Sequence, residues 1–513
     1  MKSQIDVSGR IFYEWPDEGC RKEMRFSDPS QLAEEPYDVV IIGAGVVGSA
    51  LAYKLSQYKL RLLLVDKNYD VGEGTSKGSS AIIHTGFDAA VGTLESQLVT
   101  KASIMWPELI ENLKIPFQQC GAVLIAVDNE QYNQLEKIHQ KAIDNGVTDV
   151  KVLTSGEVKE LVPNVSPEAR GGMSIPRESI IDAFSIPIAF SEVALANGTD
   201  ILLGVEIVDV EDADKSIKKI VTASGKSIPT KLIVNVAGLG SSKITPKYNG
   251  KFFDLNPRRG QFIIYDEFSR SMVDKILLPI PTAQTKGVLV IPTISGNLLA
   301  GPTAEDFPLD DETAADTTID GLELMLKGAS RLMPSLKDLP RIGSFAGIRC
   351  ACSQGTYQIR YNDGHPGILT VSGIRSTGVT SSPALAEYLV EGLAKECGLS
   401  LVKNPEATDS RPENRWPGWW KRPYENNGAV KNRPEYGRII CNCENISQGE
   451  IIDALSSPLQ PFTLDAIKRR TWTQTGRCQG FDCMAKIAKI ISEHCNIPLN
   501  KITKKGPGSE IAC

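Results

Sequence analysis

The sequence predicts an α/β protein of several domains. Three observations carry this prediction: apolar runs typical of buried parallel strands, a glycine-rich turn between one such run and a helix, and a cysteine pattern confined to the C-terminal part. The 513 residues exceed the usual size of one domain. With 41% hydrophobic and 23% charged residues, the composition is that of a globular protein, not a disordered or fibrous one.

Charge and hydropathy argue against several classes of protein. Lys and Arg number 56 against 62 Asp and Glu, and the resulting net charge of -6 argues against a nucleic-acid partner. No run reaches the roughly 18 apolar residues of a membrane span, and the longest, 39–53, is interrupted by glycines. The N-terminus lacks the apolar core of a secretory signal. We therefore expect a cytoplasmic protein without a transmembrane segment, for which peripheral docking to a membrane stays open.

Changes in composition divide the chain. Residues 1–36 are polar and aperiodic, and we expect them to form an N-terminal extension. Regular apolar patterns then occupy 37–400. The stretch 401–437 is rich in Pro, Asn and Gly and is expected to be a linker. A compact C-terminal module is expected at 438–498, followed by a short tail, 499–513.

The first regular unit, YDVVIIGAGVVGSALAYKLSQYKLRLLLVDKN, predicts a strand, a glycine turn, a helix and a second strand. Gly43 permits the tight turn, Gly45 lets a pyrophosphate approach the backbone, and Gly48 lets the helix lie close to the sheet. Asp66 ends the second strand and can accept hydrogen bonds from a ribose. The unit predicts a Rossmann-like dinucleotide site, the alternative being a glycine turn without a cofactor. It does not distinguish NAD from FAD.

A Gly/Ser/Thr-rich stretch at 73–88, directly after the second strand, makes that distinction by resemblance. Together with further segments in the same order, it resembles the glycerol-3-phosphate dehydrogenase/oxidase and L-2-hydroxyglutarate oxidase branch of the D-amino-acid-oxidase-like FAD superfamily. The resemblance implies FAD and oxidation of a C–H bond next to a hydroxyl or amine. The matching segments are Gly43–Gly48, TSKGSSAIIHTGFD (75–88), NPRRGQF (256–262), PTAQTKGVLVIPT (281–293), GNLLAGPTAEDF (296–307), GIR (347–349) and GIRSTGVTSSPALAEY (373–388).

The same resemblance implies a fold. A Rossmann-like FAD-binding domain is interleaved with an α+β substrate domain that carries a mixed or antiparallel sheet, and a small helical module follows. FAD-binding parts are expected at about 37–125, 185–250 and 345–400, and substrate-binding parts at about 126–184 and 251–344. Further residues implied to bind FAD are Lys67, Thr75, Ser76, Ser79, Ser80, Gly238, Gly373, Gly378, Val379 and Thr380.

Oxidation of an alcohol by a flavin needs a base for the hydroxyl proton. The chain has four histidines, and His139, His365 and His494 lie in segments where a structural role is expected. His84 lies in the Ser/Gly loop next to the expected flavin, where the resemblance places a catalytic histidine. We predict that His84 is the base. The alternatives are a histidine that packs against the flavin ring and a covalent attachment point.

The substrate's anionic group needs a clamp that points its C–H bond at the flavin. By resemblance, Arg349 matches an arginine that holds the substrate's acidic group, and Lys286 matches a lysine of the glycerol-phosphate site. Arginine offers a planar fork to carboxylate or phosphate, whereas lysine offers a compact charge. Ser376 matches a polar residue close to both flavin and substrate.

Two features leave the anion's identity open. Arg258 and Arg259 could bind a second anionic group or simply be solvated charges. Directly after the predicted arginine clamp, Cys350 and Cys352 stand where the family more often has a proline-containing run. The shape of the substrate pocket therefore stays open.

The C-terminal module carries the second specific signal. Cys441 and Cys443 form a CxC pair, and Cys478 and Cys483 follow 34 residues later as CxxxxC. Four thiolates suit an iron–sulfur cluster or zinc, and zinc sites more often use CxxC pairs. The spacing and the words IICNCENIS and RRTWTQTGRCQGFDC resemble the bacterioferritin-associated-ferredoxin-like [2Fe–2S] domain. Zinc and an empty, degenerate site are the alternatives.

These observations predict an FAD-dependent dehydrogenase that oxidises a small anionic secondary alcohol, with glycerol 3-phosphate as first choice. A [2Fe–2S] cluster would pass electrons to an external acceptor, a quinone, a ferredoxin or another flavoprotein. L-2-hydroxyglutarate or another 2-hydroxy acid is the second choice of substrate, and an amino acid the third. A rival of another class is a flavin and iron–sulfur electron carrier without a small-molecule substrate. The cluster could also serve only to stabilise the module, and the oligomeric state stays open.

Overall fold

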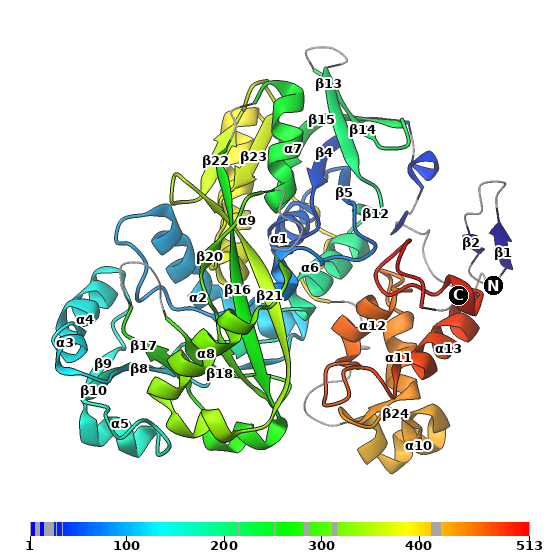
Figure 1. The fold of residues 1–513 in the computed structure, drawn as a ribbon. Helices are drawn as coiled ribbons and strands as arrows, with labels where there is room; N and C mark the ends of the chain where they lie inside the picture. Colours follow the sequence, from blue (N-terminus) through cyan, green and yellow to red (C-terminus); the bar gives the residue numbers. More distant parts are fainter. Residues whose placement is uncertain are drawn as a thin grey trace.

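The fold consists of two interleaved domains and the C-terminal module (Figure 1). Of the residues singled out above, Lys286 lies outside the described part of the chain. The computed structural model describes residues 2–5, 11–14, 25–26, 28–32, 34–212, 216–250, 253–281, 287–309, 315–411 and 422–511.

The first domain is built on a mostly parallel sheet. Its centre consists of β15 (Ser227–Asn235), β4 (Tyr37–Ile42) and β5 (Leu62–Asp66), which run parallel. Alternate residues of β4 face opposite hydrophobic cores, because both faces of the sheet are covered. The other strands are β3 (Arg25–Phe26), β12 (Asp200–Leu203), β13 (Ile207–Asp212), β14 (Lys218–Thr222), β22 (Gln358–Tyr361) and β23 (Ile368–Ser372). The larger helices of this domain are α1 (Val46–Leu55), α2 (Leu94–Leu113), α6 (Ser185–Ala196) and α9 (Gly378–Cys397).

The second domain is built on a mixed sheet, in which β17 and β8 pair in parallel and the other pairs are antiparallel. Its long strands β16 and β21 run side by side down the middle of the view (Figure 1). The strands are β8 (Ala122–Ala126), β9 (Lys151–Thr154), β10 (Gly171–Ile175), β16 (Leu255–Tyr265), β17 (Ile276–Pro279), β18 (Leu289–Pro292), β19 (Leu298–Gly301), β20 (Glu305–Asp306) and β21 (Arg341–Cys352). The helices are α3 (Asn129–Tyr132), α4 (Leu135–Asp144), α5 (Ser155–Leu161) and α8 (Ile319–Leu332).

A small antiparallel sheet brings together segments far apart in the chain. β11 (Ser179–Ile181) pairs with β6 (Ile82–Ile83) on one side and with β7 (Phe117–Gln118) on the other. In this register Ser179 lies opposite Ile83. The residue after β6 therefore lies opposite the residue before β11.

The C-terminal module has its own hydrophobic core. The helix over Gln448–Leu455 begins with a capping box, in which the Ser447 hydroxyl and the Glu450 carboxylate satisfy each other's backbone N–H groups. Thr463 caps the helix over Leu464–Thr471. The elements are α10 (Asn427–Asn432), β24 (Ile439–Cys441), β25 (Ile446–Ser447), α11 (Gln448–Leu455), α12 (Leu464–Thr471) and α13 (Met484–Cys495).

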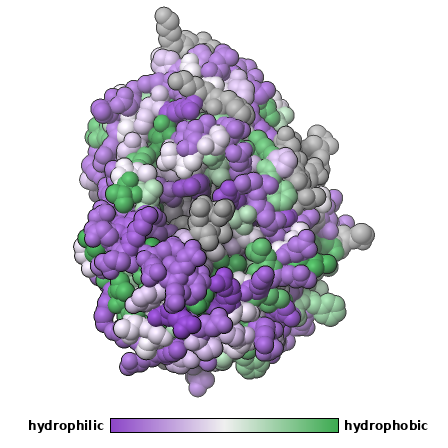
Figure 2. All heavy atoms as spheres, turned by 60° about the vertical axis from the view of Figure 1, so that its left-hand side comes forward, coloured by the Kyte–Doolittle hydropathy of each residue, from purple (hydrophilic) through white to green (hydrophobic). Residues whose placement is uncertain are grey.

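The remaining elements are short. β1 (Lys2–Ile5) pairs with β2 (Ile11–Glu14), and β3 extends the parallel sheet beside β12. The molecular face in Figure 2 is mostly hydrophilic with scattered apolar residues, and no helix among the described residues could cross a membrane. The other helices are α7 (Ser241–Ile244), η1 (Pro29–Gln31), η2 (Thr75–Gly78), η3 (Gly238–Gly240), η4 (Thr245–Tyr248), η5 (Glu267–Met272), η7 (Pro334–Asp338), η8 (Pro423–Glu425), η9 (Pro434–Gly437) and η10 (Leu499–Lys501).

Candidate active site

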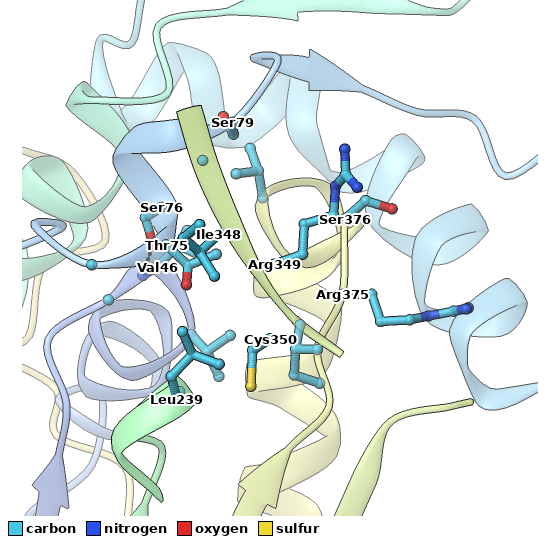
Figure 3. A pocket seen from close by; sticks show the side chains of 18 of the residues that line it. Val46, Thr75, Ser76, Ser79, Leu239, Ile348, Arg349, Cys350, Arg375 and Ser376 are labelled. Carbon is cyan, nitrogen blue, oxygen red and sulfur yellow. Dashed lines mark hydrogen bonds between the residues drawn. The ribbon is translucent and has the colours of Figure 1, made fainter. Parts of the chain in front are cut away.

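A cavity of about 760 Å³ lies between the two domains. The ends of β4 and β5, the turn η2, the strand β21 and the start of α9 line it (Figure 3). The domains meet closely at one point: a Cβ on Gly347 would lie only 2.0 Å from the Gly78 carbonyl oxygen. The volume falls within the usual range of ligand sites.

The glycine turn between β4 and α1 has the geometry that a pyrophosphate needs. Gly43 has φ +112°, and a Cβ there would lie 2.7 Å from the Val236 carbonyl oxygen. A Cβ on Gly48 would lie 1.8 Å from the Gly43 oxygen, so both glycines are required by packing. Gly45 is different, since the nearest atom to its added Cβ is Ser76 Oγ at 3.5 Å. Because Gly45 has no side chain, the cavity stays open at the N-terminus of α1, a position that favours a bound anion.

Asp66 lines the same part of the cavity. Its Oδ2 accepts a hydrogen bond from Ala44 N at 2.7 Å, and its Oδ1 accepts from Asn68 N and Nδ2 at 2.8 and 2.9 Å. Burial raises the pKa of this carboxyl, and the bonds from Asn68 and Ala44 oppose that shift. The carboxylate is thus oriented by the turn itself, and it retains acceptor capacity for a ribose.

Most of the other predicted cofactor contacts also line the cavity, and two do not. Gly373 has φ +68°, and a Cβ there would lie 2.7 Å from Cys352 Sγ, so it is required by packing. Thr380 Oγ1 accepts a hydrogen bond from the backbone N–H of His84 at 3.0 Å and so holds that loop from outside the cavity. Those that line the cavity are Lys67, Thr75, Ser76, Ser79, Ser80, Gly238, Gly378 and Val379.

His84 lines the cavity and is oriented by a residue that the sequence analysis missed. Its Nδ1 lies 3.0 Å from Oε2 of Glu178, whose side chain is 0% exposed. The other oxygen of Glu178 accepts hydrogen bonds from Thr85 N and Thr85 Oγ1 at 2.7 and 3.0 Å. A carboxylate at Nδ1 favours the tautomer with its proton on that nitrogen, which leaves a lone pair on Nε2. The register of β6 and β11 creates this pair, and no local motif signals it.

Arg349 enters the cavity from β21 (Figure 3). Its Nη2 donates to the Thr303 carbonyl oxygen at 3.1 Å, and among the described residues no carboxylate oxygen lies within 4.0 Å of its guanidinium. Burial and the neighbouring charge of Arg258 lower its pKa to about 10. Gly260 makes room for this side chain, since a Cβ there would lie 2.4 Å from Arg349 Nη2. The guanidinium is therefore placed to receive an anion.

The two arginines of β16 have carboxylate partners. Arg258 makes a two-pronged contact with Asp306 at 2.6 and 2.7 Å, although it also lines the cavity. Arg259 is buried and pairs with Glu305 at 2.6 Å. Both arginines are thus paired with carboxylates, and a second anionic group for them stays a prediction.

The loop before α9 carries Ser376, which lines the cavity and is exposed there (Figure 3). Its neighbours are tied to Glu95, a second residue that the sequence analysis missed. Arg375 Nη2 donates to Glu95 Oε2 at 2.5 Å, and Thr377 Oγ1 donates to Glu95 Oε1 at 2.6 Å. The loop around Ser376 is held from both sides.

The cysteines after the arginine clamp are both buried. Cys350 lines the cavity, and Cys352 Sγ lies 3.4 Å from the Thr356 carbonyl oxygen. Lys286 lies outside the described residues, but the next residue along the chain, Gly287, lines the cavity.

The four cysteines of the C-terminal module approach one another as two pairs. A hydrogen bond between the thiols lowers the pKa of Cys441 and raises that of Cys483, the Cys441 value falling to about 6. Cys443 and Cys478 form the second hydrogen-bonded pair. Within the described ranges, no three His, Cys, Asp or Glu side chains converge as they would around one metal ion. Two cysteine pairs fit a two-iron cluster, which takes four thiolates, two on each iron.

Comparison with known families defines the class of protein. The chain belongs to the FAD dependent oxidoreductase family, whose model matches residues 38–392. The BFD-like [2Fe-2S] binding domain matches residues 439–493. The family resemblance, the fold class and both cofactors predicted from the sequence are thereby confirmed. When bound, FAD supplies the hydride acceptor and the cluster carries single electrons.

Individual proteins similar to this chain include glycerol 3-phosphate dehydrogenases and oxidases. It is 36% identical over 482 residues to the glycerol 3-phosphate dehydrogenase of Caloramator mitchellensis, covering 93% of this chain and 98% of the relative. It is 29% identical to the glycerol 3-phosphate oxidase of Mycoplasma pneumoniae, over 72% of this chain and 97% of that protein. A solved structure of the L-alpha-glycerophosphate oxidase of Mycoplasma pneumoniae with FAD bound matches with a TM-score of 0.69 and 28% identity, over 73% of this chain and 98% of that one.

Proposed function

We propose that this FAD-dependent oxidoreductase oxidises glycerol 3-phosphate to dihydroxyacetone phosphate and passes the electrons through its [2Fe–2S] cluster to an external acceptor. The observation that carries the proposal is one cavity that is lined both by the imidazole of His84, oriented by Glu178, and by the guanidinium of Arg349. The Caloramator relative supports the substrate, because it matches nearly the whole chain.

In this proposal the chain's residues divide the chemistry. Arg349 binds the phosphate, with Lys286 as a second cation, and this orients the secondary alcohol. Nε2 of His84 takes the proton of the substrate's hydroxyl group while the hydride leaves the carbon that bears this hydroxyl. The resulting imidazolium is stabilised by the buried carboxylate of Glu178 at 3.0 Å. Ser376 orients the substrate from the loop before α9.

The route by which electrons leave is supported by the position of the C-terminal module. A Cβ on Gly343 of β21 would lie 3.4 Å from the side chain of Gln479, which follows the cluster ligand Cys478. Gly347 lines the cavity four residues further along the same strand. At about 3.3 Å per residue, these two points of the strand are roughly 13 Å apart. One rigid strand therefore connects the cavity wall to the cluster loop.

We also propose the domain limits given above. The strands of the parallel sheet from β4 onward fall within 37–125, 185–250 and 345–400. β8 and β21 cross the proposed limits, since both belong to the mixed sheet.

The test is an anaerobic absorbance titration of the protein that holds both cofactors. Glycerol 3-phosphate is expected to bleach the flavin bands and then part of the cluster absorbance. If L-2-hydroxyglutarate or an amino acid bleached the flavin instead, that compound would replace glycerol 3-phosphate as the proposed substrate. If only a protein partner or a reduced nicotinamide bleached the flavin, the chain would be an electron carrier. Bleached flavin with an unchanged cluster would remove the electron relay but leave the dehydrogenase.

A further inference from the structure

A buried cluster of charges joins the C-terminal module to the FAD-binding domain. The two terminal nitrogens of Arg470, on α12, donate hydrogen bonds to the two carboxylate oxygens of Asp70 at 2.7 and 2.9 Å. Arg469 reaches Asp70 at 2.7 Å and Glu73 at 2.6 Å with one nitrogen. All four side chains are at most 5% exposed. Both arginines lie in the sequence RRTW (469–472).

The two acids lie on a loop between two groups of residues that line the cavity and are predicted to bind FAD. This loop, residues 67–74, runs from Asp66 at the end of β5 to Thr75 at the start of η2. Between the acids, Gly72 N donates to the carbonyl oxygen of Ala44, the residue between the first two glycines of the turn. Beyond the loop, Ser76 Oγ accepts from Val46 N at 3.0 Å, at the start of α1. The loop is thus bonded to the glycine turn from both sides.

Two further contacts prevent the module from turning about this junction. Trp472, two residues after Arg470, packs against Phe184 with ring centroids 5.1 Å apart. Arg477 makes a two-pronged contact with Asp266 at 2.5 and 2.9 Å, at the end of β16. The three contacts involve both interleaved domains, so a rotation of the module would break at least one of them.

Buried carboxylates without these arginines would be costly. Removing one partner of a buried ion pair leaves an uncompensated charge, and this is strongly destabilising. Such a carboxylate must take up a proton or reach water, and in the second case the loop that bears Asp70 and Glu73 moves away from Ala44. That movement would open the wall of the cofactor cavity.

We propose that Arg469 and Arg470 are positioning residues for FAD. By compensating Asp70 and Glu73 they hold loop 67–74 against the glycine turn, so the C-terminal module completes the FAD site and stays docked there during turnover. This inference concerns the cofactor and does not depend on the substrate.

The test uses the full chain with both cofactors and the variants Arg469→Gln and Arg470→Gln. FAD release, followed by the rise of free-flavin fluorescence after dilution, is expected to accelerate at least tenfold. Hydrogen exchange of amides in 67–74 should accelerate too, a readout independent of activity. The matched control is Lys489→Gln, because Lys489 lies on α13 in an exposed pair with Glu493 and should release FAD at the native rate. Iron content and cluster absorbance identify variants whose module is intact.

Unchanged FAD release and exchange in variants that keep their cluster would overturn the proposal. If neither glutamine variant folds, Arg470→Lys keeps the charge but loses the two-pronged contact, and an intermediate release rate is expected. The native protein supplies an independent check. Buried pairs are little screened, so FAD release should be the same at 0.1 M and 1 M NaCl, whereas strong acceleration by salt would show that the module is held by exposed contacts.

Discussion

The proposed catalytic end of the cavity and the junction with the C-terminal module both depend on buried carboxylates, but their partners differ. Glu178 faces the imidazole of His84, a side chain whose two ring nitrogens can donate and accept protons. Asp70 faces the guanidinium groups of Arg469 and Arg470, which remain charged. The first pair is therefore suited to proton transfer, and the second to holding two parts of the chain together.

The electrostatics of the junction agree with its structural role. Burial alone would raise the pKa of Asp70, but the charges of Arg470 and Arg469 hold it well below the ordinary range of a carboxyl. Substitutions at the proposed catalytic pair, His84 and Glu178, should therefore change rates and leave FAD bound. Substitutions at the junction should release FAD and leave the chemistry of the loaded enzyme alone.

The largest effect is expected for His84→Gln. Without a base, reduction of the flavin by glycerol 3-phosphate should slow by about 10³-fold, because general base catalysis contributes about 10² to 10⁴. Stopped-flow absorbance at saturating substrate measures this rate, and the FAD content should stay native. An unaltered rate would remove His84 from the chemistry, and loss of FAD would favour its role as a packing or attachment residue.

A smaller effect is expected for Glu178→Gln, which keeps the shape but not the charge. Flavin reduction should slow by about 10²-fold, since the amide no longer stabilises the imidazolium. The pH profile of the reduction rate should shift, whereas a merely structural residue would leave the profile in place. Glu178→Asp should recover part of the rate, and failure of both variants to alter the profile would contradict the assignment.

Substitution of the anion clamp should act on binding. Arg349→Ala is expected to raise KM for glycerol 3-phosphate by about 10²-fold, since a bidentate, charge-assisted contact is lost. Arg349→Lys should fall between the native and alanine proteins. Steady-state kinetics with an artificial electron acceptor measures KM for both variants. An unchanged KM would show that Arg349 does not bind the phosphate.

Lys286→Ala tests whether a second cation binds the phosphate. If Lys286 adds a second cation for phosphate, KM for glycerol 3-phosphate should rise by at least about tenfold. A KM equal to that of the native protein would exclude Lys286 from the site and leave the phosphate to Arg349 alone.

The smallest effect is expected from a double variant that removes one positive and one negative charge from the junction. Asp70→Asn combined with Arg470→Gln removes both charges, and FAD release should return to within about threefold of the native rate, because no uncompensated charge remains. Release as fast as in Arg470→Gln alone would show that the arginine acts through other contacts.

The parts of this protein that local sequence determined are the ones built from nearby backbone. The glycine turn and Asp66 lie within one strand–helix–strand unit, so spacing alone identified the dinucleotide site. The C-terminal [2Fe–2S] domain was recognisable because a cluster constrains the type and spacing of the cysteines. The predicted FAD contacts at Gly373 and Thr380 stay predictions: neither residue lines the cavity, and resemblance in sequence does not say which side of a turn faces a ligand.

Tertiary structure alone decided which distant charges meet. Glu178 stands 94 positions from His84, and the register of β6 and β11 brings them together. Arg470 stands 400 positions from Asp70, and only the docking of the module makes their pairing possible. Each of these carboxylates appears in the sequence as an ordinary polar residue, because a buried charge acquires its partner from the packing of separate elements and not from its neighbours in the chain.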